Sequence, residues 1–158
     1  MNANNIASNL RIRYSEDYMS DQQIQDFLEG TENLSFDRYL VGLSYGTNEI
    51  KEFRFSDNSS VKVPTTWGDS NFRDYNITPA DATVRTANIM YKDGGILTGL
   101  ELLDKDNKSV LKVGPTESYK VVTVELKENE RIIGFRSSKR GSSYAYHYDF
   151  QLIIGWLV

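Results

Sequence analysis

The sequence contains no cysteine. Disulfide scaffolds, zinc sites built on cysteine and thiol nucleophiles are therefore excluded. Histidine occurs once, at His147, so a catalytic dyad or triad would have to include that residue, and a metal site would have one nitrogen ligand at most. A Gly-x-Ser-x-Gly nucleophile motif is also missing. We therefore predict that the protein is not an enzyme and that it holds no metal ion or cofactor.

Basic residues are not in excess either. The chain has 18 Lys and Arg against 22 Asp and Glu, a formal net charge of -4, whereas nucleic-acid binders usually carry a basic face. No apolar run approaches the roughly 20 residues that cross a bilayer. Residues 1–8 lack the basic start and apolar stretch of a secretory signal. We expect no nucleic acid and no membrane span. A full-length chain would be cytoplasmic, whereas a domain excised from a larger parent protein could be extracellular.

The alternation of apolar and polar residues is the strongest positive signal. Residues 50–63 alternate on both sides of a polar turn, which indicates a β-hairpin. Residues 97–113 repeat this design, and residues 150–154 begin a third alternating run. The repeat has a period of about 45–50 residues, typical of arrays of similar units. Four strands per unit predict several small sheets that share one core.

The third repeat stops early, because the sequence ends at Val158. An unpaired, buried strand edge would leave backbone groups without hydrogen bonds, so the strand at residues 150–154 needs a partner from elsewhere. We expect residues 34–45 to supply that partner, which would close the domain by pairing its two ends.

The first part of the chain differs from the rest. Residues 1–30 are polar, with one strand expected at residues 10–14 and one short helix that Ser20 or Asp21 would cap and Gly30 would end. We interpret residues 1–30 as an N-terminal extension that packs on a domain formed by residues 31–158.

The layout resembles that of the jacalin-related lectins. Phe36 and Asp37, followed by residues 40–46, are similar to the family's opening Phe-Asp and the strand after it. Residues 130–138, with a Gly-Phe pair inside an apolar run, resemble its penultimate strand. The resemblance implies an all-β fold, namely a β-prism I of three four-stranded antiparallel sheets with pseudo-threefold symmetry, plus the polar extension. It also implies a carbohydrate-binding module whose partner is a glycan or glycoprotein.

The predicted ligand site is the stretch of residues 141–149. A sugar needs a carboxylate that accepts hydroxyl hydrogen bonds, backbone donors nearby and an aromatic face. A carboxylate, a glycine-led loop and several tyrosines occur together in this stretch. The candidate ligand-binding residues are Gly141, Tyr144, Tyr146, His147, Tyr148 and Asp149. Alternatively, the tyrosines pack on a neighbouring sheet and Asp149 only fixes the loop.

The register of the last strand leaves the position of that carboxylate open. If Phe150 and Leu152 face the core, Asp149 points to the opposite side. A β-bulge would change this and could place Tyr148 in the ligand-facing position instead.

The corresponding loops of the other repeats can be compared. Gly46, Asn48 and Glu49 offer a second site, whereas residues 94–98 lack a carboxylate and predict only a turn. Residues 104–107 are similar to the start of a calcium loop, but the later glycine and glutamate are missing, so a hairpin turn is expected.

One further expectation concerns the surface. The acidic turn at residues 128–130 is expected to be solvated.

A rival to sugar binding is a structural or protein-interaction module that kept the prism and lost the sugar site. The poor match to the family's glycine-rich loop before Phe36 favours this rival. A single shallow sugar site would bind weakly, so a homo-oligomer or several copies in a parent protein would raise the affinity.

Overall fold

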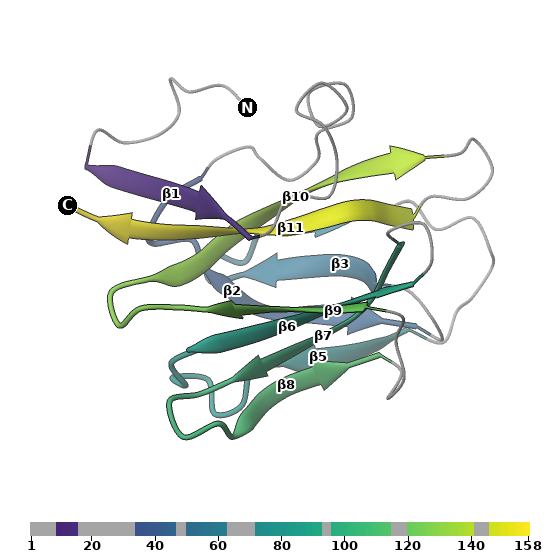
Figure 1. The fold of residues 1–158 in the computed structure, drawn as a ribbon, viewed down its shortest axis with the longest axis horizontal. Helices are drawn as coiled ribbons and strands as arrows, with labels where there is room; N and C mark the ends of the chain where they lie inside the picture. Colours follow the sequence, from purple (N-terminus) through teal and green to yellow (C-terminus); the bar gives the residue numbers. More distant parts are fainter. Residues whose placement is uncertain are drawn as a thin grey trace.

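The computed structural model describes residues 9–15, 34–46, 50–62, 72–92, 96–114, 120–140 and 146–158; for residues 62, 92, 96, 137–140 and 146–150 it describes the backbone alone. The regular structure in these ranges is entirely β-strand (Figure 1). The strands are β1 (Leu10–Tyr14), β2 (Leu40–Tyr45), β3 (Ile50–Phe55), β4 (Ser60–Lys62), β5 (Arg73–Asn76), β6 (Thr86–Lys92), β7 (Ile96–Leu103), β8 (Ser109–Val113), β9 (Lys120–Glu125), β10 (Arg131–Arg140) and β11 (Tyr146–Leu157). Within these ranges no helix is long and apolar enough to cross a membrane. The helix expected before Gly30 falls outside them.

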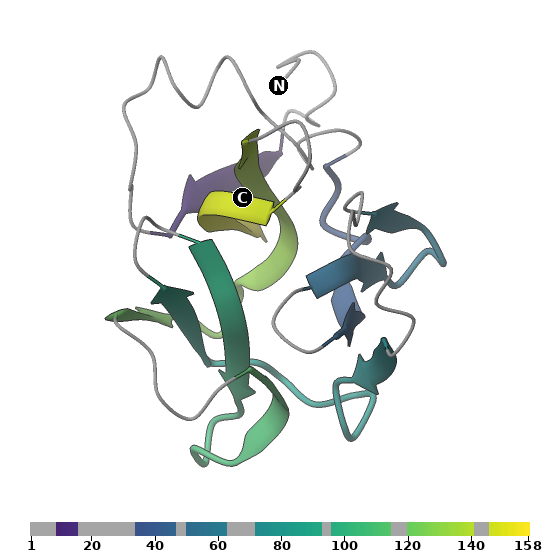
Figure 2. The ribbon, with the colours of Figure 1, turned by 90° about the vertical axis from the view of Figure 1, so that its right-hand side faces the viewer.

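The strands form three antiparallel groups around one interior, as Figure 2 shows. One sheet has the order β4-β3-β2-β5, and a second group has the order β8-β7-β6-β9. In the third group β11 lies between β1 and β10, and a single pair, Tyr148 with Ile96, joins this group to β7. This arrangement confirms the predicted β-prism.

The main core lies where the inner faces of the three groups meet. Phe53 on β3 and Phe135 on β10 are both 1% exposed, and their ring centroids are 4.4 Å apart. Ile89 on β6 is fully buried in the same cluster. Alternating apolar residues thus place one side of each strand in a shared interior, which removes that surface from water.

The two predicted hairpins are confirmed, and their turns show why the prediction succeeded. The β3–β4 turn contains Asn58 with φ 68°, and the β7–β8 turn contains Asn107 with φ 59°. Asparagine tolerates this left-handed conformation better than most residues. The Asp104 carboxylate accepts hydrogen bonds from the backbone N–H groups of Asp106 and Lys108 at 2.9 and 3.0 Å. The calcium-like sequence is therefore a hairpin turn closed by its own aspartate.

The expected partner of the last strand was wrong. β11 pairs with β1, in a register that runs from Leu10 opposite Leu157 to Tyr14 opposite Ile153. Residues 40–45 form β2, whose two edges are already taken by β3 and β5. A strand with both edges paired has no backbone groups left for a third neighbour. The two ends of the domain do close on each other, but through β1.

A second, smaller apolar cluster covers the outer face of the β1-β11-β10 group. Leu10 and Leu34 are each 4% exposed, and they pack with Ile133 and Ile153, which are fully buried. Adding a Cβ at Gly155 would bring it within 2.6 Å of Ile133 Cδ1, so the glycine makes room for this packing. The strand expected at residues 10–14 is therefore an integral part of a sheet.

Candidate functional site

The segments predicted to bind ligands follow strands that end on the same side of the molecule. β2, β6 and β10 all end on the right-hand side of Figure 1. Gly46, the residue after β2, is buried. Asn48 and Glu49, the other residues of the predicted second site, lie outside the described residues. The three loops that were compared in the sequence therefore follow strands that end at one end of the prism.

The main predicted site straddles the boundary of the described residues. Gly141 and Tyr144 lie outside them. β11 begins at Tyr146, and His147 pairs with Lys139 on β10. The prediction of a loop as far as Asp149 was therefore wrong for its last residues, whose backbone is in the strand ladder. Alternating β-branched or aromatic residues with polar ones suit an extended strand as well as a loop.

A register shift lies at the position where the sequence left two possibilities open. Arg136 on β10 pairs with Gln151, and Ser138 pairs with Tyr148. Between these pairs β11 advances by one residue more than β10, which is the definition of a β-bulge. Asp149 is one of the two residues inside this irregularity. Bulges re-aim side chains, so the simple two-residue alternation does not apply at Asp149.

A buried polar group lies directly below this bulge. The side chain of Gln151 is fully buried; its Nε2 donates to the Ser15 carbonyl at 3.1 Å, and its Oε1 accepts from Arg136 Nε at 2.6 Å. The Ser15 hydroxyl accepts from the backbone N–H of Leu152 at 2.9 Å. The Arg136 guanidinium lies 3.5 Å from the centre of the Tyr14 ring. These contacts fix the middle of β11 to the end of β1.

Sequence analysis did not single out this polar base. A signal was present, because Gln151 is a polar residue inside an otherwise apolar run. A buried polar side chain is retained in such a run only if it finds hydrogen-bond partners. Its partner Ser15 is 136 positions away in the chain, so the pairing itself could not be foreseen.

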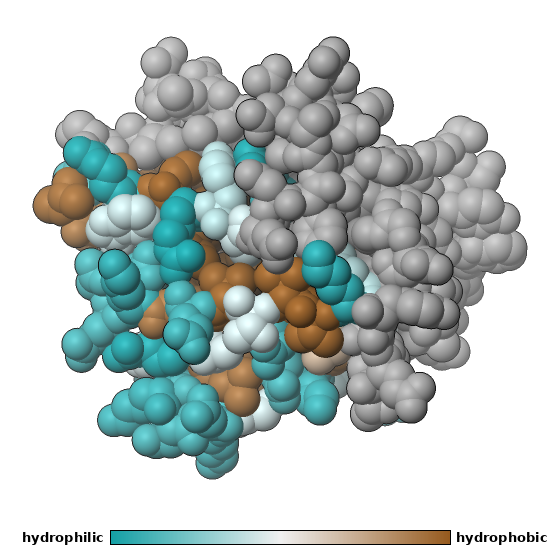
Figure 3. Space-filling view, in the orientation of Figure 1, coloured by the Kyte–Doolittle hydropathy of each residue, from teal (hydrophilic) through white to brown (hydrophobic). Residues whose placement is uncertain are grey.

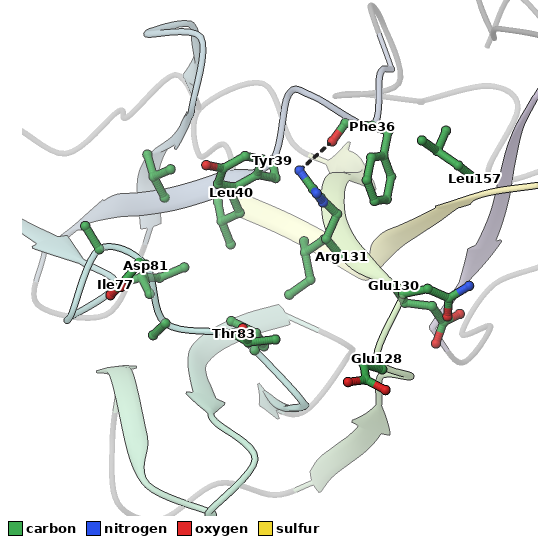
Figure 4. Close-up of a pocket in the computed structure, with 16 residues that line it drawn as sticks. Phe36, Tyr39, Leu40, Ile77, Asp81, Thr83, Glu128, Glu130, Arg131 and Leu157 are labelled. Carbon is green, nitrogen blue, oxygen red and sulfur yellow. Dashed lines mark hydrogen bonds between the residues drawn. The ribbon is translucent and has the colours of Figure 1, made fainter.

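The opposite end of the prism contains a pocket of about 430 Å³ (Figure 4). Its lining includes Phe36 and Tyr39 before β2, Ile77 and residues 80–84 between β5 and β6, residues 128–131 before and at the start of β10, and Leu157 on β11. β2 and β10 begin here and run towards the predicted ligand end. The pocket and the predicted site therefore lie at opposite ends of the same strands.

Arg131 is the central polar side chain of the pocket. Its guanidinium carbon lies 3.7 Å from the centre of the Phe36 ring and 4.9 Å from that of Tyr39, and Nη1 donates to the Phe36 carbonyl at 3.1 Å. Figure 4 shows the guanidinium between the two aromatic residues. Cation–π contacts of this kind hold a charged group in place without an ion pair.

Exposed apolar side chains gather at this pocket. The face drawn in Figure 3 is largely hydrophilic over the described residues, with hydrophobic residues in its middle and at its upper left. Among the described residues, the large hydrophobic side chains that remain exposed are Tyr39, Val121, Leu157 and Val158. Tyr39 and Leu157 both line the pocket. Solvent thus reaches an aromatic ring and an aliphatic side chain at one cavity.

The acidic turn beside the pocket is not solvated throughout, contrary to expectation. The side chain of Glu130 is 4% exposed and accepts hydrogen bonds from Arg13 Nε and Nη2 at 2.8 and 3.0 Å. The backbone N–H of Lys127 donates to it at 2.7 Å, and Arg13 also donates to the Glu125 carbonyl. The hydrogen bonds from Arg13 and Lys127 lower the pKa of Glu130 although burial opposes them. β1 is thereby tied to the β9–β10 turn.

This ion pair predicts an acid-sensitive contribution to stability. Because the pKa of Glu130 is lower in the folded state, the contribution is complete above the ordinary value of 4.5 and is lost as the pH falls through the lowered value. Glu130→Gln should cost about 1.5–3 kcal/mol of unfolding free energy at pH 7, the contribution of a hydrogen bond to a charged group. Urea unfolding at pH 7 and pH 3 measures both effects. An equal cost at the two pH values would contradict the assignment.

The described residues contain no group of three or more His, Asp or Glu side chains that could hold a metal ion. Some of these carboxylates accept short hydrogen bonds from other side chains of the protein. Asp74 accepts from the Ser44 hydroxyl at 2.6 Å and from Arg54 Nη1 at 3.1 Å. Such carboxylates act as internal acceptors on the outer face of a sheet.

Solved structures of known proteins share this architecture, although no family model matches the chain and no curated protein matches it in sequence. Artocarpin complexed with methyl-α-mannose is 14% identical, with a TM-score of 0.58 over 96% of this chain and 100% of artocarpin. Calystegia sepium agglutinin is 14% identical, with a TM-score of 0.60 over 97% and 100%. PirB is 12% identical, with a TM-score of 0.62; the match covers 97% of this chain but only 40% of PirB. The sheets and these likenesses together show that the chain has the β-prism fold of the jacalin-related lectins.

Proposed function

We propose that the protein is a non-catalytic module that binds a glycan through residues 141–149. The observation that carries this proposal is the β-bulge at Asp149, which interrupts the β10–β11 ladder immediately beside the predicted ligand loop. A bulge next to a loop re-aims side chains at the end of a sheet, and binding residues commonly stand on loops held by a rigid scaffold. Artocarpin, which has the same fold, was solved with methyl-α-mannose bound.

The described residues supply the rigid base that such a site needs. Gln151 and Ser15 are both buried and join β11 to β1 through their hydrogen bonds. Arg136 donates to Gln151 and is held against Tyr14. A preorganised base reduces the conformational entropy that would be lost when a ligand orders the loop.

In this mechanism the glycan is held by non-covalent contacts, chiefly hydrogen bonds, and no covalent bond is formed or broken. The Asp149 carboxylate accepts hydrogen bonds from two sugar hydroxyls, and backbone N–H groups after Gly141 donate to the ring or hydroxyl oxygens. Tyr144, Tyr146 or Tyr148 covers the apolar C–H face of the sugar. His147 lies in the same segment and can donate to or accept from a hydroxyl.

Replacing Asp149 tests the proposal directly. Asp149→Ala should weaken glycan binding at least tenfold, because each charge-assisted hydrogen bond contributes about 1.5–3 kcal/mol. A glycan array identifies the ligand, and isothermal titration calorimetry measures the loss of affinity. Asp106→Ala is the matched control, because this exposed carboxylate belongs to the β7–β8 turn, and its affinity should not change.

Two results would contradict glycan binding. One is the absence of any bound glycan on the array at millimolar sugar concentrations. The other is an Asp149→Ala variant that binds as tightly as the unaltered protein. A stoichiometric protein partner that free sugars do not displace would favour the interaction module instead.

A further inference from the structure

We propose that the pocket at the opposite end of the prism is a second ligand site, separate from residues 141–149, which binds a neutral saccharide. The pocket has a volume of about 430 Å³, within the range of roughly 300–1,000 Å³ typical of small-molecule sites. It combines an aromatic surface, a fixed donor and exposed acceptors, the three features that sugar recognition requires.

The aromatic surface and the donor are held together as one unit. Arg131 lies against Phe36 at 3.7 Å and near Tyr39 at 4.9 Å, and one of its nitrogens is bonded to the Phe36 carbonyl. A guanidinium has five N–H donors, so most of them are available at the edge of the group. Tyr39 is 38% exposed, and its ring is accessible for the C–H face of a sugar.

The acceptors lie on the other two walls of the pocket. Asp81, in the β5–β6 connection, is exposed and makes no hydrogen bond or ion pair with any described residue. Glu128, in the β9–β10 turn, has a side chain that is 91% exposed, and its nearest cation is Arg85 at 3.9 Å. Thr83 between them adds a hydroxyl. Figure 4 shows these side chains around the same space as Arg131.

The charge of the walls indicates which ligand fits. The lining contains three carboxylates, those of Asp81, Glu128 and Glu130, against the guanidinium of Arg131. Glu130 is paired with Arg13, and the largely exposed Glu128 has only a long contact with Arg85 at 3.9 Å. The negative charge of Asp81 and Glu128 therefore disfavours an anionic ligand. A hydroxyl group both donates and accepts a hydrogen bond, so a neutral polyol can use the carboxylates and the guanidinium together.

The position of the pocket gives the domain two binding ends. β10 starts at the pocket and has 10 residues. At about 3.3 Å per residue, the strand separates the two sites by roughly 30 Å. Ligands at the two ends could not contact each other, so one domain would bridge two glycan chains.

Chemical-shift titration of the whole 158-residue chain tests this inference. The probes are methyl glycosides of mannose, glucose and galactose and N-acetylglucosamine, each added to about 50 mM. At least one should shift the backbone amide signals of residues 81–84 and 128–131. Glucuronate, the anionic counterpart, should bind at least tenfold more weakly because of the wall carboxylates.

Conservative substitutions complete the test without disturbing the fold. The double variant Asp81→Asn and Glu128→Gln should weaken the saccharide at least tenfold at this end, because it removes both charged acceptors. Asp106→Asn, in the β7–β8 turn, whose residues do not line the pocket, should leave the affinity at this end unchanged, and so should Asp149→Ala.

Three outcomes would overturn the second site. They are shifts confined to the residues near Gly46 and Tyr146, equal binding of glucuronate, and an unchanged affinity of the double variant. Because Asp149→Ala is expected to weaken binding at one end only, failure of either site is distinguishable from failure of the other.

Discussion

A chain that begins at residue 31 should fail to form the stable prism, because it lacks β1. This strand pairs with β11 from Leu10 to Tyr14, and Leu10 is 4% exposed in the outer apolar cluster. The loss of one buried leucine costs about 2–5 kcal/mol, and each lost ladder hydrogen bond adds about 1 kcal/mol. The sum is comparable to the 5–15 kcal/mol by which domains are typically stable.

Circular dichroism and urea unfolding of the shortened chain measure this effect. The expected result is loss of a cooperative transition, or insoluble protein. A cooperative transition at the same urea concentration as the full chain would show that residues 1–30 are a dispensable extension.

Two leucines that face each other across β1 and β11 provide a matched pair of variants. Leu10 and Leu157 are register partners, but Leu10 is buried and Leu157 is 45% exposed. Leu10→Ala should therefore cost several times more unfolding free energy than Leu157→Ala. Similar costs for the two variants would contradict the role of β1 in the outer cluster.

Phe135→Ala should have the second large effect, a loss of about 3–5 kcal/mol of unfolding free energy. The ring is 1% exposed and lies 4.4 Å from that of Phe53, so it connects the inner face of β10 with that of β3. Its removal leaves a cavity where the sheets meet, and the surrounding strands can close it only in part.

Denaturant unfolding of Phe135→Ala, Phe135→Leu and Val121→Ala separates packing from general perturbation. Phe135→Leu should recover much of the stability because it refills most of the space. Val121 is 49% exposed on β9, and its truncation should change the unfolding free energy by less than about 0.5 kcal/mol. A Phe135→Ala variant as stable as Val121→Ala would refute the position of Phe135 in the core.

The parts of the fold that depend on residues close together in the sequence were predictable. Asn58 and Asn107 adopt the left-handed conformation that their turns need, and the alternating residues before and after them form the hairpin arms. Both signals are local, since turn type and side-chain alternation are decided within a few residues. The resemblance of the whole pattern to a known family supplied the three-sheet arrangement.

The closure of the prism was not predictable in the same way. Residues 10–14 and 40–45 both alternate sufficiently to form strands, and the sequence alone does not state which edges are already paired. β2 pairs with β3 along one edge and with β5 along the other. It therefore cannot pair with β11, whose partner is β1. Pairing between distant segments depends on the whole set of contacts, so a local pattern cannot decide it.

The candidate sites show a similar division. The predicted ligand segment was recognised by its residue types, and it ends at a bulge that the register problem anticipated at Asp149. The pocket was missed because its walls come from three separate turns. Glu130 was expected in water because it belongs to an acidic turn, but Arg13, 117 positions away, holds it in a part-buried ion pair.

The pairing of Leu10 with Leu157 also determines where attached polypeptide would leave the domain. The backbone N–H of Val158 donates to the Asn9 carbonyl at 3.0 Å, so the incoming and outgoing chain are neighbours at the pocket end. A tether fused after Val158 would hold the molecule by the pocket end and present the Gly46 and Tyr146 side outward. Immobilisation at this point would thus orient the prism on a sensor surface, and a bulky carrier there would obstruct the pocket before it obstructed the far loops.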